Sequence, residues 1–233
     1  MHRDTSRGTA DEEITLADKA YRHLRDDIVA GLLAPGDRLR IARLSERYRI
    51  GASPLREALS LLTSEYLVVM EGQRGFSVSP TSVAELDDLS RVRCDVENDA
   101  LRRAIAVGDD AWESGIVAAF HQLGKADRRR REDPGAHAAA WETSNREFHR
   151  ALVAACDSPW LERLRELLYY QHERYRRISL SHPDPARDLH AEHRAIMDAT
   201  LERDAERATR LSEAHIRRTT EAVRAVLERG RAA

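Results

Sequence analysis

Apolar side chains near the N-terminus recur every four residues, at Leu16, Ala20, Leu24, Ile28 and Leu32. Because side chains four residues apart share one face of an α-helix, this pattern predicts an amphipathic helix over residues 17–30. Gly31 favours the end of that helix, since glycine readily adopts the left-handed conformation found after helix C-termini. Pro35 and Gly36 then predict a turn.

Two shorter helices are predicted next, over residues 41–48 and from Ser53 to about residue 64. We expect Ser53 to cap the second of them, because a serine hydroxyl accepts a hydrogen bond from a free amide of the first turn. Pro54 suits the first helical position, where its missing N–H is not needed. The side chains expected to be buried are Ile41, Leu44 and Tyr48 in the first helix and Leu55, Ala58, Leu59 and Leu62 in the second.

The periodicity changes from helix to strand after residue 64. Residues 67–70 are a short apolar run and residues 76–79 alternate apolar and polar side chains, so both segments predict strands. Between them, Gly72 and Gly75 indicate a tight turn. Three helices followed by a hairpin is the element order of a winged helix-turn-helix, which we predict over residues 15–80.

From residue 82 to the end the pattern is helical throughout. The predicted helices span residues 82–106, 109–131, 135–156, 159–180, 186–203 and 205–229, with glycine, proline and aspartate at the breaks. The predicted fold class is therefore mainly α, with an N-terminal winged helix-turn-helix and an all-α bundle over residues 81–233. Residues 1–14 are mostly polar and predict a disordered lead-in.

The charge of the chain is nearly balanced, with a formal net charge of -2, so DNA binding would require a local basic patch. Residues 38–80 contain Arg38, Arg40, Arg43, Arg47, Arg49, Arg56 and Arg74, against Glu46, Glu57, Glu65 and Glu71. Arg56, one turn into the third helix, can reach a phosphate or a guanine edge, and Arg74 at the hairpin tip suits the narrow minor groove. Alternatively, these arginines form a solvated face.

The cysteines and the lack of long apolar segments indicate a cytoplasmic protein. Cys94 and Cys156 form no C-x-x-C pair, so we expect reduced thiols buried as small core residues. No apolar run approaches the roughly 20 residues that span a bilayer, and the N-terminus does not resemble a signal peptide. We therefore expect no membrane partner. Trp112, Trp141 and Trp160 are expected to be packing residues.

Four polar side chains in the helical half form a candidate metal site. Asn145 and His149 are four residues apart and share one helix face, while His193 and His215 lie on two later helices. Neutral imidazoles from three helices, with one oxygen donor, could hold Zn²⁺ or Ni²⁺ and leave open positions for a carboxylate ligand. Dispersed histidines on helices are also commonly surface or hydrogen-bonded core residues, and spacing alone leaves both interpretations open.

Several short runs resemble the GntR family of bacterial transcription regulators. They are PGDRL (35–39), LSE (44–46), SPLREAL (53–59), LV (67–68) and GQRGF (72–76), of which SPLREAL is the most specific. The resemblance implies DNA contacts from Arg38, Arg43, Ser53, Arg56, Gln73 and Arg74. Many members carry a base-reading arginine at the position of Ala52, so a different operator is implied. The run GASP (51–54) instead resembles the branch containing the repressor of glutarate utilisation.

A second set of runs, NREFH (145–149), EHRAIM (192–197) and AHI (214–216), resembles the FCD effector domain of the FadR-like branch. That domain is a bundle of six or seven helices, and many members hold a metal with an aspartate and three histidines. The resemblance therefore implies a metal site at Asn145, His149, His193 and His215. Since a neutral amide oxygen binds a hard cation less strongly than a carboxylate, Asn145 implies weaker metal binding or a direct contact with the effector.

Arg93 and Glu97 resemble the Arg-x-x-x-Glu feature on the first helix of the FCD domain. There, Arg93 would bind an effector carboxylate through two hydrogen bonds. Alternatively, the two residues form an i,i+4 ion pair that only supports the helix. His190, three residues before His193, is interpreted as a neighbour of the metal site or a surface residue.

The resemblances together imply a ligand-responsive transcription repressor rather than an enzyme. A homodimer would bind a pseudo-palindromic operator, and a small carboxylate, such as the dicarboxylate glutarate, would release it. Two other hypotheses stay open. One is a metal-dependent hydrolase fused to a DNA-binding module, although no H-E-x-x-H pattern and no nucleophile stands out. The other is an architectural DNA-binding dimer without an effector.

Overall fold

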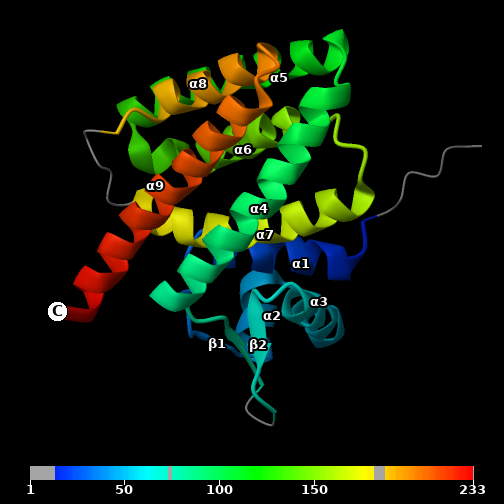
Figure 1. Ribbon diagram of the computed structural model, residues 1–233. Helices are drawn as coiled ribbons and strands as arrows, with labels where there is room; N and C mark the ends of the chain where they lie inside the picture. Colours follow the sequence, from blue (N-terminus) through cyan, green and yellow to red (C-terminus); the bar gives the residue numbers. More distant parts are fainter. Residues whose placement is uncertain (1–13, 73–74, 181–186, 233) are drawn as a thin grey trace, which may run out of the picture. The chain divides into compact units, whose positions relative to one another are not determined.

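Residues 14–72, 75–180 and 187–232 are described by the computed structural model (Figure 1). They divide into an N-terminal unit, which comprises residues up to 28 and 32–79, and a C-terminal unit, which comprises residues 29–31 and those from Pro80 onwards. Gln73 and Arg74 lie outside the described residues, as does nearly all of the predicted lead-in. In the described ranges, no helix combines the length and the hydropathy that a membrane span requires.

The N-terminal unit combines helices with a small sheet. Its elements are α1 (Leu16–Val29), β1 (Arg38–Leu39), α2 (Ile41–Tyr48), α3 (Ala52–Ser64), β2 (Val68–Met70) and β3 (Phe76–Val78). Leu24 of α1 shares one buried cluster with Leu55 and Leu59 of α3. Leu16 and Leu32 are 55% and 64% exposed, so the buried stripe of the first helix is shorter than the apolar pattern suggests.

Strand β3 lies between β1 and β2 and is antiparallel to both. Phe76 is the partner of Leu39 on one side and of Met70 on the other. The apolar pattern does not predict β1, because two residues are too few to show an alternation. In the turn between β2 and β3, Gly72 and Gly75 adopt φ values of 50° and 84°, which explains why glycine occupies both positions.

The start of α3 differs from the prediction. The helix begins at Ala52 after Gly51, and no side chain caps it. Arg49 ends α2 in the left-handed conformation, and Gly51 is extended, with φ -64° and ψ 163°. The chain therefore enters α3 earlier than expected. Ser53 is not the cap; it lies exposed in the first turn, next to Pro54.

The described part of the C-terminal unit is a bundle of six helices, in agreement with the predicted fold class. They are α4 (Val83–Val107), α5 (Asp110–Glu132), α6 (Pro134–Leu152), α7 (Pro159–Leu180), α8 (Leu189–Leu201) and α9 (Ala205–Ala232). Helix α6 ends earlier than predicted because the chain turns after it, with Cys156 N–H donating to the Val153 carbonyl at 2.8 Å. Helix α8 begins at Leu189 because Asp188 caps it through the Ala191 N–H.

Packing within the bundle places α4 beside both α7 and α9, α5 beside α6, and α8 beside α9 (Figure 1). The ion pairs of Glu85 with Arg174 and of Glu97 with Arg165 show that α4 and α7 are antiparallel. Cys94 and Cys156 are buried and unpaired, as expected of small core residues. This arrangement lets polar side chains of α4, α6, α7, α8 and α9 approach one another inside the bundle.

Two of the three tryptophans pack in the core as predicted. The indole N–H of Trp112 donates to the Ala151 carbonyl, and that of Trp141 donates to the Asp127 carboxylate. Trp160 is 71% exposed, so the prediction that it is a packing residue is wrong. It lies in the first turn of α7, where the guanidinium of exposed Arg163 is 5.1 Å from its ring.

Candidate functional site

The residues predicted to contact DNA lie at the surface of the N-terminal unit, where the structure describes them. Arg38 is in β1, Arg43 in α2, and Ser53 and Arg56 are near the start of α3; all four are exposed. Within the described ranges, none of the three arginines forms an ion pair with a carboxylate. Their guanidinium groups are therefore free to approach phosphates or base edges.

Three histidines from three different helices converge inside the C-terminal unit. His149 of α6, His193 of α8 and His215 of α9 offer ring nitrogens that all lie within 4.8 Å of one another. The ring centroids of His193 and His215 are 4.7 Å apart, and His149 is 5.3 Å from each of them. Imidazoles at this separation can coordinate one metal ion after small side-chain movements.

Burial keeps these imidazoles in the form that binds metals. It lowers the pKa of His149 and His193 well below the usual value for histidine, and the neighbouring His215 lowers both pKa values further. Burial also lowers the pKa of His215, although the hydrogen bond to Glu192 opposes that change. Neutral imidazoles have a free lone pair at neutral pH, as a metal ligand requires.

Glu192 orients His215 from outside the group. Its Oε2 lies 2.8 Å from His215 Nδ1, which leaves Nε2 to face the other histidines. Arg187 donates two hydrogen bonds to the same carboxylate, at 3.0 and 2.8 Å, and Arg218 donates a third at 3.1 Å. Burial alone would raise the pKa of Glu192, but the hydrogen bonds from His215 and Arg187 outweigh it and lower the pKa. A carboxylate behind a histidine in this way is typical of metal sites.

Asn145 supplies an unpaired oxygen one helical turn from His149. Its Nδ2 donates to the Tyr169 hydroxyl at 2.9 Å, while its buried Oδ1 has no hydrogen-bond partner among the described residues. Both ring nitrogens of His193 are likewise buried and unpartnered. Since buried polar atoms are almost always hydrogen-bonded, these unpaired atoms indicate a ligand that binds here. The donor set fits a divalent metal.

A buried charge cluster lies on the α4 and α7 side of the site. Arg93, 2% exposed, donates to Glu97 Oε1 at 3.4 Å and lies 2.8 Å from His172 Nδ1. Arg165 donates to the other Glu97 oxygen at 3.0 Å. The predicted i,i+4 pair of Arg93 and Glu97 thus exists, but it is buried and does not act as a surface support. Because two arginines share one carboxylate, the cluster carries an uncompensated positive charge.

Sequence reasoning missed the polar residues of α7. Arg176 forms a buried ion pair with Glu142 of α6, with a shortest contact of 2.6 Å, and also donates to the Tyr169 hydroxyl. The guanidinium groups of Arg93, Arg165 and Arg176 lie 4.8, 6.0 and 5.0 Å from the Tyr169 ring. In sequence these residues look like an exposed helix face, because polar residues show the same pattern at a solvated surface and in a buried network.

His190 is separate from the group of three histidines. Its Nδ1 lies 3.1 Å from Asp127 Oδ2, and its ring stacks on Phe120 with centroids 4.9 Å apart. Asp127 also accepts from Trp141, so His190 belongs to a structural contact between α5 and α8 rather than to the site.

Two family models match the chain. "Bacterial regulatory proteins, gntR family" matches residues 16–78, and "FCD domain" matches residues 88–218. The chain is 44% identical to the uncharacterized HTH-type transcriptional regulator BphR of Paraburkholderia xenovorans, over 90% of this chain and 86% of that protein. It is 36% identical to the HTH-type transcriptional repressor GlaR of Escherichia coli K12, over 84% of this chain and 90% of that protein.

Solved structures with the same fold are also known. E. coli McbR/YncC superposes with a TM-score of 0.76 at 20% identity, covering 91% of this chain and 98% of that one. A GntR regulator from Rhodococcus sp. RHA1 superposes with a TM-score of 0.69 at 22% identity, covering 91% and 97%. These two structures and this chain therefore share one fold, a winged helix-turn-helix followed by a helical bundle.

Proposed function

The chain belongs to the gntR family of bacterial regulatory proteins and carries an FCD domain, and we propose that it represses transcription until a small carboxylate binds to that domain. It is a DNA-binding transcriptional regulator. Its similarity to the repressor GlaR supports repression. Helix α3 would enter the major groove, with contacts from Arg38, Arg43, Ser53 and Arg56, and the wing residues Gln73 and Arg74 would add to them.

The metal would be held by Asn145, His149, His193 and His215. Imidazole ligands favour Zn²⁺ or Ni²⁺, and a bound ion would supply open coordination positions for a carboxylate. The observation that carries this proposal is the approach of the three imidazoles to within 4.8 Å of one another. Both ring nitrogens of His193, and Asn145 Oδ1 one helical turn from His149, are buried and lack a hydrogen-bond partner among the described residues.

The excess positive charge of the buried arginines near the three histidines supports a carboxylate effector. Arg93 and Arg165 share Glu97, which leaves one positive charge of the buried cluster without a partner. Arg93 would donate to the carboxylate of the effector, and Asn145 would contact the effector or the metal. A dicarboxylate such as glutarate is the first compound to test.

Release of DNA would follow from linkage between the two ligands. The effector would favour an arrangement of the two winged domains in the dimer that no longer matches the spacing of the operator half-sites. Effector and operator would then weaken each other's binding by the same factor. The two alternatives have less support, because the relatives are regulators rather than hydrolases, and an architectural dimer would not require buried unpaired metal ligands.

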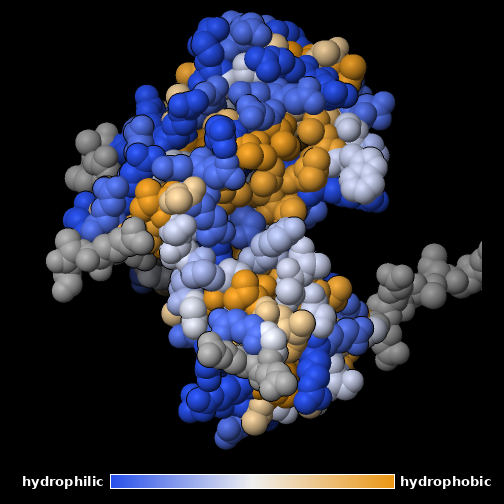
Figure 2. Space-filling model, turned by 60° about the horizontal axis from the view of Figure 1, so that its bottom comes forward, coloured by the Kyte–Doolittle hydropathy of each residue, from blue (hydrophilic) through white to orange (hydrophobic). Residues whose placement is uncertain are grey.

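A homodimer is supported by apolar surface. Figure 2 shows a broad hydrophobic area on the C-terminal unit. The exposed apolar side chains of this unit include Val92 of α4 and Leu164 of α7, which are 40% and 48% exposed. Exposed apolar area of this kind is typical of an interface. A second copy of the chain would cover it. Leu164→Glu is then expected to give a monomer in light scattering, whereas the same change at exposed Leu61 of α3 is expected to leave the dimer intact.

The proposed function is tested by an electrophoretic mobility shift with the DNA upstream of the chain's own gene. We expect a complex at moderate salt that dissociates when glutarate or another small dicarboxylate is added. The absence of any complex at moderate salt would overturn the central proposal. Elemental analysis tests the metal: the double substitution His149→Ala and His193→Ala is expected to remove it, and unchanged metal content would contradict the assigned ligands.

A further inference from the structure

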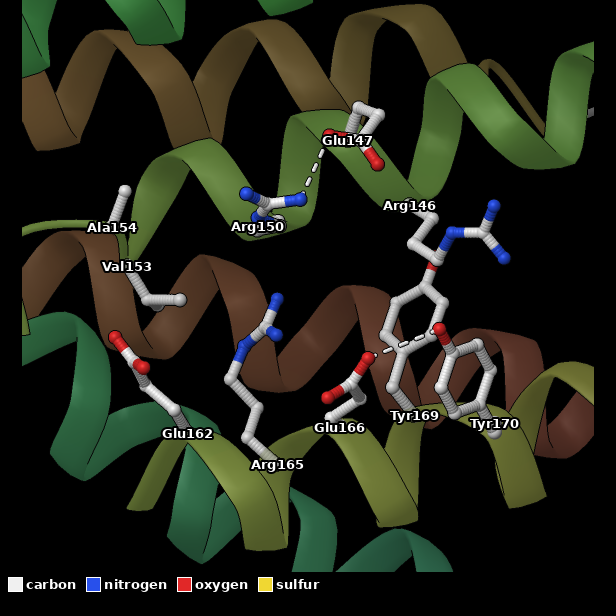
Figure 3. Close-up of a pocket in the computed structure, with 10 residues that line it drawn as sticks. All are labelled: Arg146, Glu147, Arg150, Val153, Ala154, Glu162, Arg165, Glu166, Tyr169 and Tyr170. Carbon is white, nitrogen blue, oxygen red and sulfur yellow. Dashed lines mark hydrogen bonds and ion pairs between the residues drawn. The ribbon is translucent and has the colours of Figure 1, made fainter. Parts of the chain in front are cut away.

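A pocket of about 460 Å³ opens between α6 and α7, apart from the three histidines (Figure 3). Val153 and Ala154, directly after the end of α6, form its apolar wall, and Arg165 and Tyr169 of α7 lie opposite. In Figure 3 the side chain of Arg165 extends from α7 into the space below Arg150 and Val153. The pocket is large enough for a small organic acid.

Arg165 is the buried cation of this pocket. The residue is 7% exposed, and its Nε donates to Glu97 Oε2 at 3.0 Å. Its Nη2 is buried and has no hydrogen-bond partner within the described part of the chain. A guanidinium group donates five hydrogen bonds in a fixed fork, and its geometry matches a carboxylate. A buried donor without a partner, on a residue that lines a pocket, therefore indicates an acceptor that is supplied by a ligand.

The charges at the pocket favour an anion at its inner end only. Glu97 is shared between Arg165 and Arg93, so the buried cluster keeps one positive charge. The carboxylates of the pocket lie at its exposed rim, where Glu166 accepts from Tyr170 and Glu147 pairs with Arg150, while Glu162 is exposed to solvent. Solvent screens charges at the rim far more than a charge in the interior.

We infer that this pocket is an anion-binding site in which Arg165 binds the carboxylate group of a small organic acid. The inference deepens the proposed function, on which it rests, because it adds Arg165 and the space between α6 and α7 to the effector site. The pocket is joined to the predicted metal site through Tyr169, which lines the pocket and accepts from Asn145. It is joined to Arg93 through Glu97.

An anion bound in the pocket would change the contact between Glu97 and Arg93. An anion at Arg165 would neutralise the charge that now holds Glu97 close to Arg165. Glu97 would then be freer to shorten its 3.4 Å contact with Arg93. The carboxylate of the ligand and the polar residues around the histidines are thus coupled through one shared glutamate.

The test is calorimetric titration of the purified full-length protein with glutarate and acetate, using uncharged glutaramide as the neutral control. Arg165→Gln is expected to weaken glutarate binding at least tenfold. Arg163→Gln, the same change on the same helix at an exposed residue that does not line the pocket, is expected to leave the affinity within twofold of the original. Metal content and thermal unfolding are measured for each variant.

A second variant leaves the ion pair between Arg165 and Glu97 intact. Ala154 is exposed at the wall of the pocket, so Ala154→Phe fills the space without touching the buried cluster or the histidines. It is expected to abolish glutarate binding and keep the metal content. If glutarate releases the operator and Ala154→Phe binds it like the original protein, the pocket is not the site, although the proposed function stands. If neither acid binds the original protein, and neither releases its DNA, both proposals are overturned.

Discussion

Asn145 gives the predicted metal site a neutral amide ligand in place of a charged carboxylate. Three neutral imidazoles and an amide would leave both charges of a divalent ion uncompensated by its direct ligands, with only Glu192 behind His215 to offset them. The amide oxygen is nevertheless buried, unpaired and one turn from His149. Such a site would gain affinity from an anionic ligand, which is consistent with a carboxylate effector.

Asn145→Asp is expected to raise the affinity for Zn²⁺ about tenfold, because a carboxylate is a stronger ligand than an amide for a cation. The Tyr169 hydroxyl can reorient to donate to the new carboxylate, so the fold is expected to tolerate the change. Competition with a chromophoric chelator measures the affinity. Asn98→Asp on α4 is the control and is expected to have no effect. Equal affinities in all three proteins would exclude position 145 from the ligand set.

Arg56 is the residue of α3 from which we expect the largest single contribution to operator binding. It is exposed near the start of the helix and forms no ion pair within the described residues. Arg56→Gln is expected to weaken operator binding by about 1–3 kcal/mol, the cost of losing a good base contact. Arg128→Gln, an exposed arginine of α5, is the control. Retention of full affinity by Arg56→Gln would assign this arginine to the solvated face.

Among the elements, α7 connects the site to its surroundings. His172 and Arg165 approach α4, and Arg176 approaches α6. These contacts are polar and buried, so each of them needs a partner to offset the loss of hydration. The helix is therefore positioned by specific pairs as much as by apolar packing, and a ligand that binds its charged residues can alter its contacts with both neighbours.

Substitutions of the ion pair between Arg176 and Glu142 test this role of α7. Both side chains are buried, and their shortest contact is 2.6 Å. Glu142→Gln is expected to lower the free energy of unfolding by about 3–5 kcal/mol, because it leaves a buried guanidinium without its counter-charge. The double substitution Glu142→Leu and Arg176→Met is expected to recover most of that loss. Urea unfolding measures both, and equal losses in the two variants would contradict an electrostatic cause.

At the scale of the whole molecule, the buried imidazoles make stability depend on pH. Burial lowers the pKa of His149, His172 and His193 well below the value of 6.5 found in unfolded chains. Below that value the unfolded chain binds protons that the folded chain excludes. The free energy of unfolding is therefore unaffected by these groups above about pH 7.5 and falls as the pH is lowered through 6.5 and beyond.

Urea unfolding of the metal-free protein at pH 7.5, 6.5 and 5.5 measures this effect. Each such histidine is expected to contribute up to about 1.4 kcal/mol of lost stability per pH unit below its unfolded pKa. Added Zn²⁺ is expected to stabilise the protein most at the higher pH, since protons compete with the metal for the imidazoles. Constant stability between pH 7.5 and 5.5 would contradict neutral, buried histidines.

The sequence alone was sufficient for the order of the helices, for the hairpin of β2 and β3, and for the fold class. Helical spacing of apolar residues predicts α1 to α9 with small errors at their ends, and the glycines at 72 and 75 indicate the turn of the wing. These features depend on interactions between residues close together in the chain, namely side chains on one helix face and the backbone conformations open to glycine. The ends of α3, α6 and α8 were less predictable, because capping and turn contacts compete there.

Only the tertiary structure decided which polar residues are buried together. A polar residue on a helix has the same spacing whether it faces water or a neighbouring helix, so the pattern of α7 did not distinguish Arg165, Tyr169 and Arg176 from a solvated face. The short strand β1 likewise exists because β3 pairs with it. Packing of helices that are distant in sequence brings His149, His193 and His215 within 4.8 Å of one another and leaves Asn145 Oδ1 unpaired beside His149.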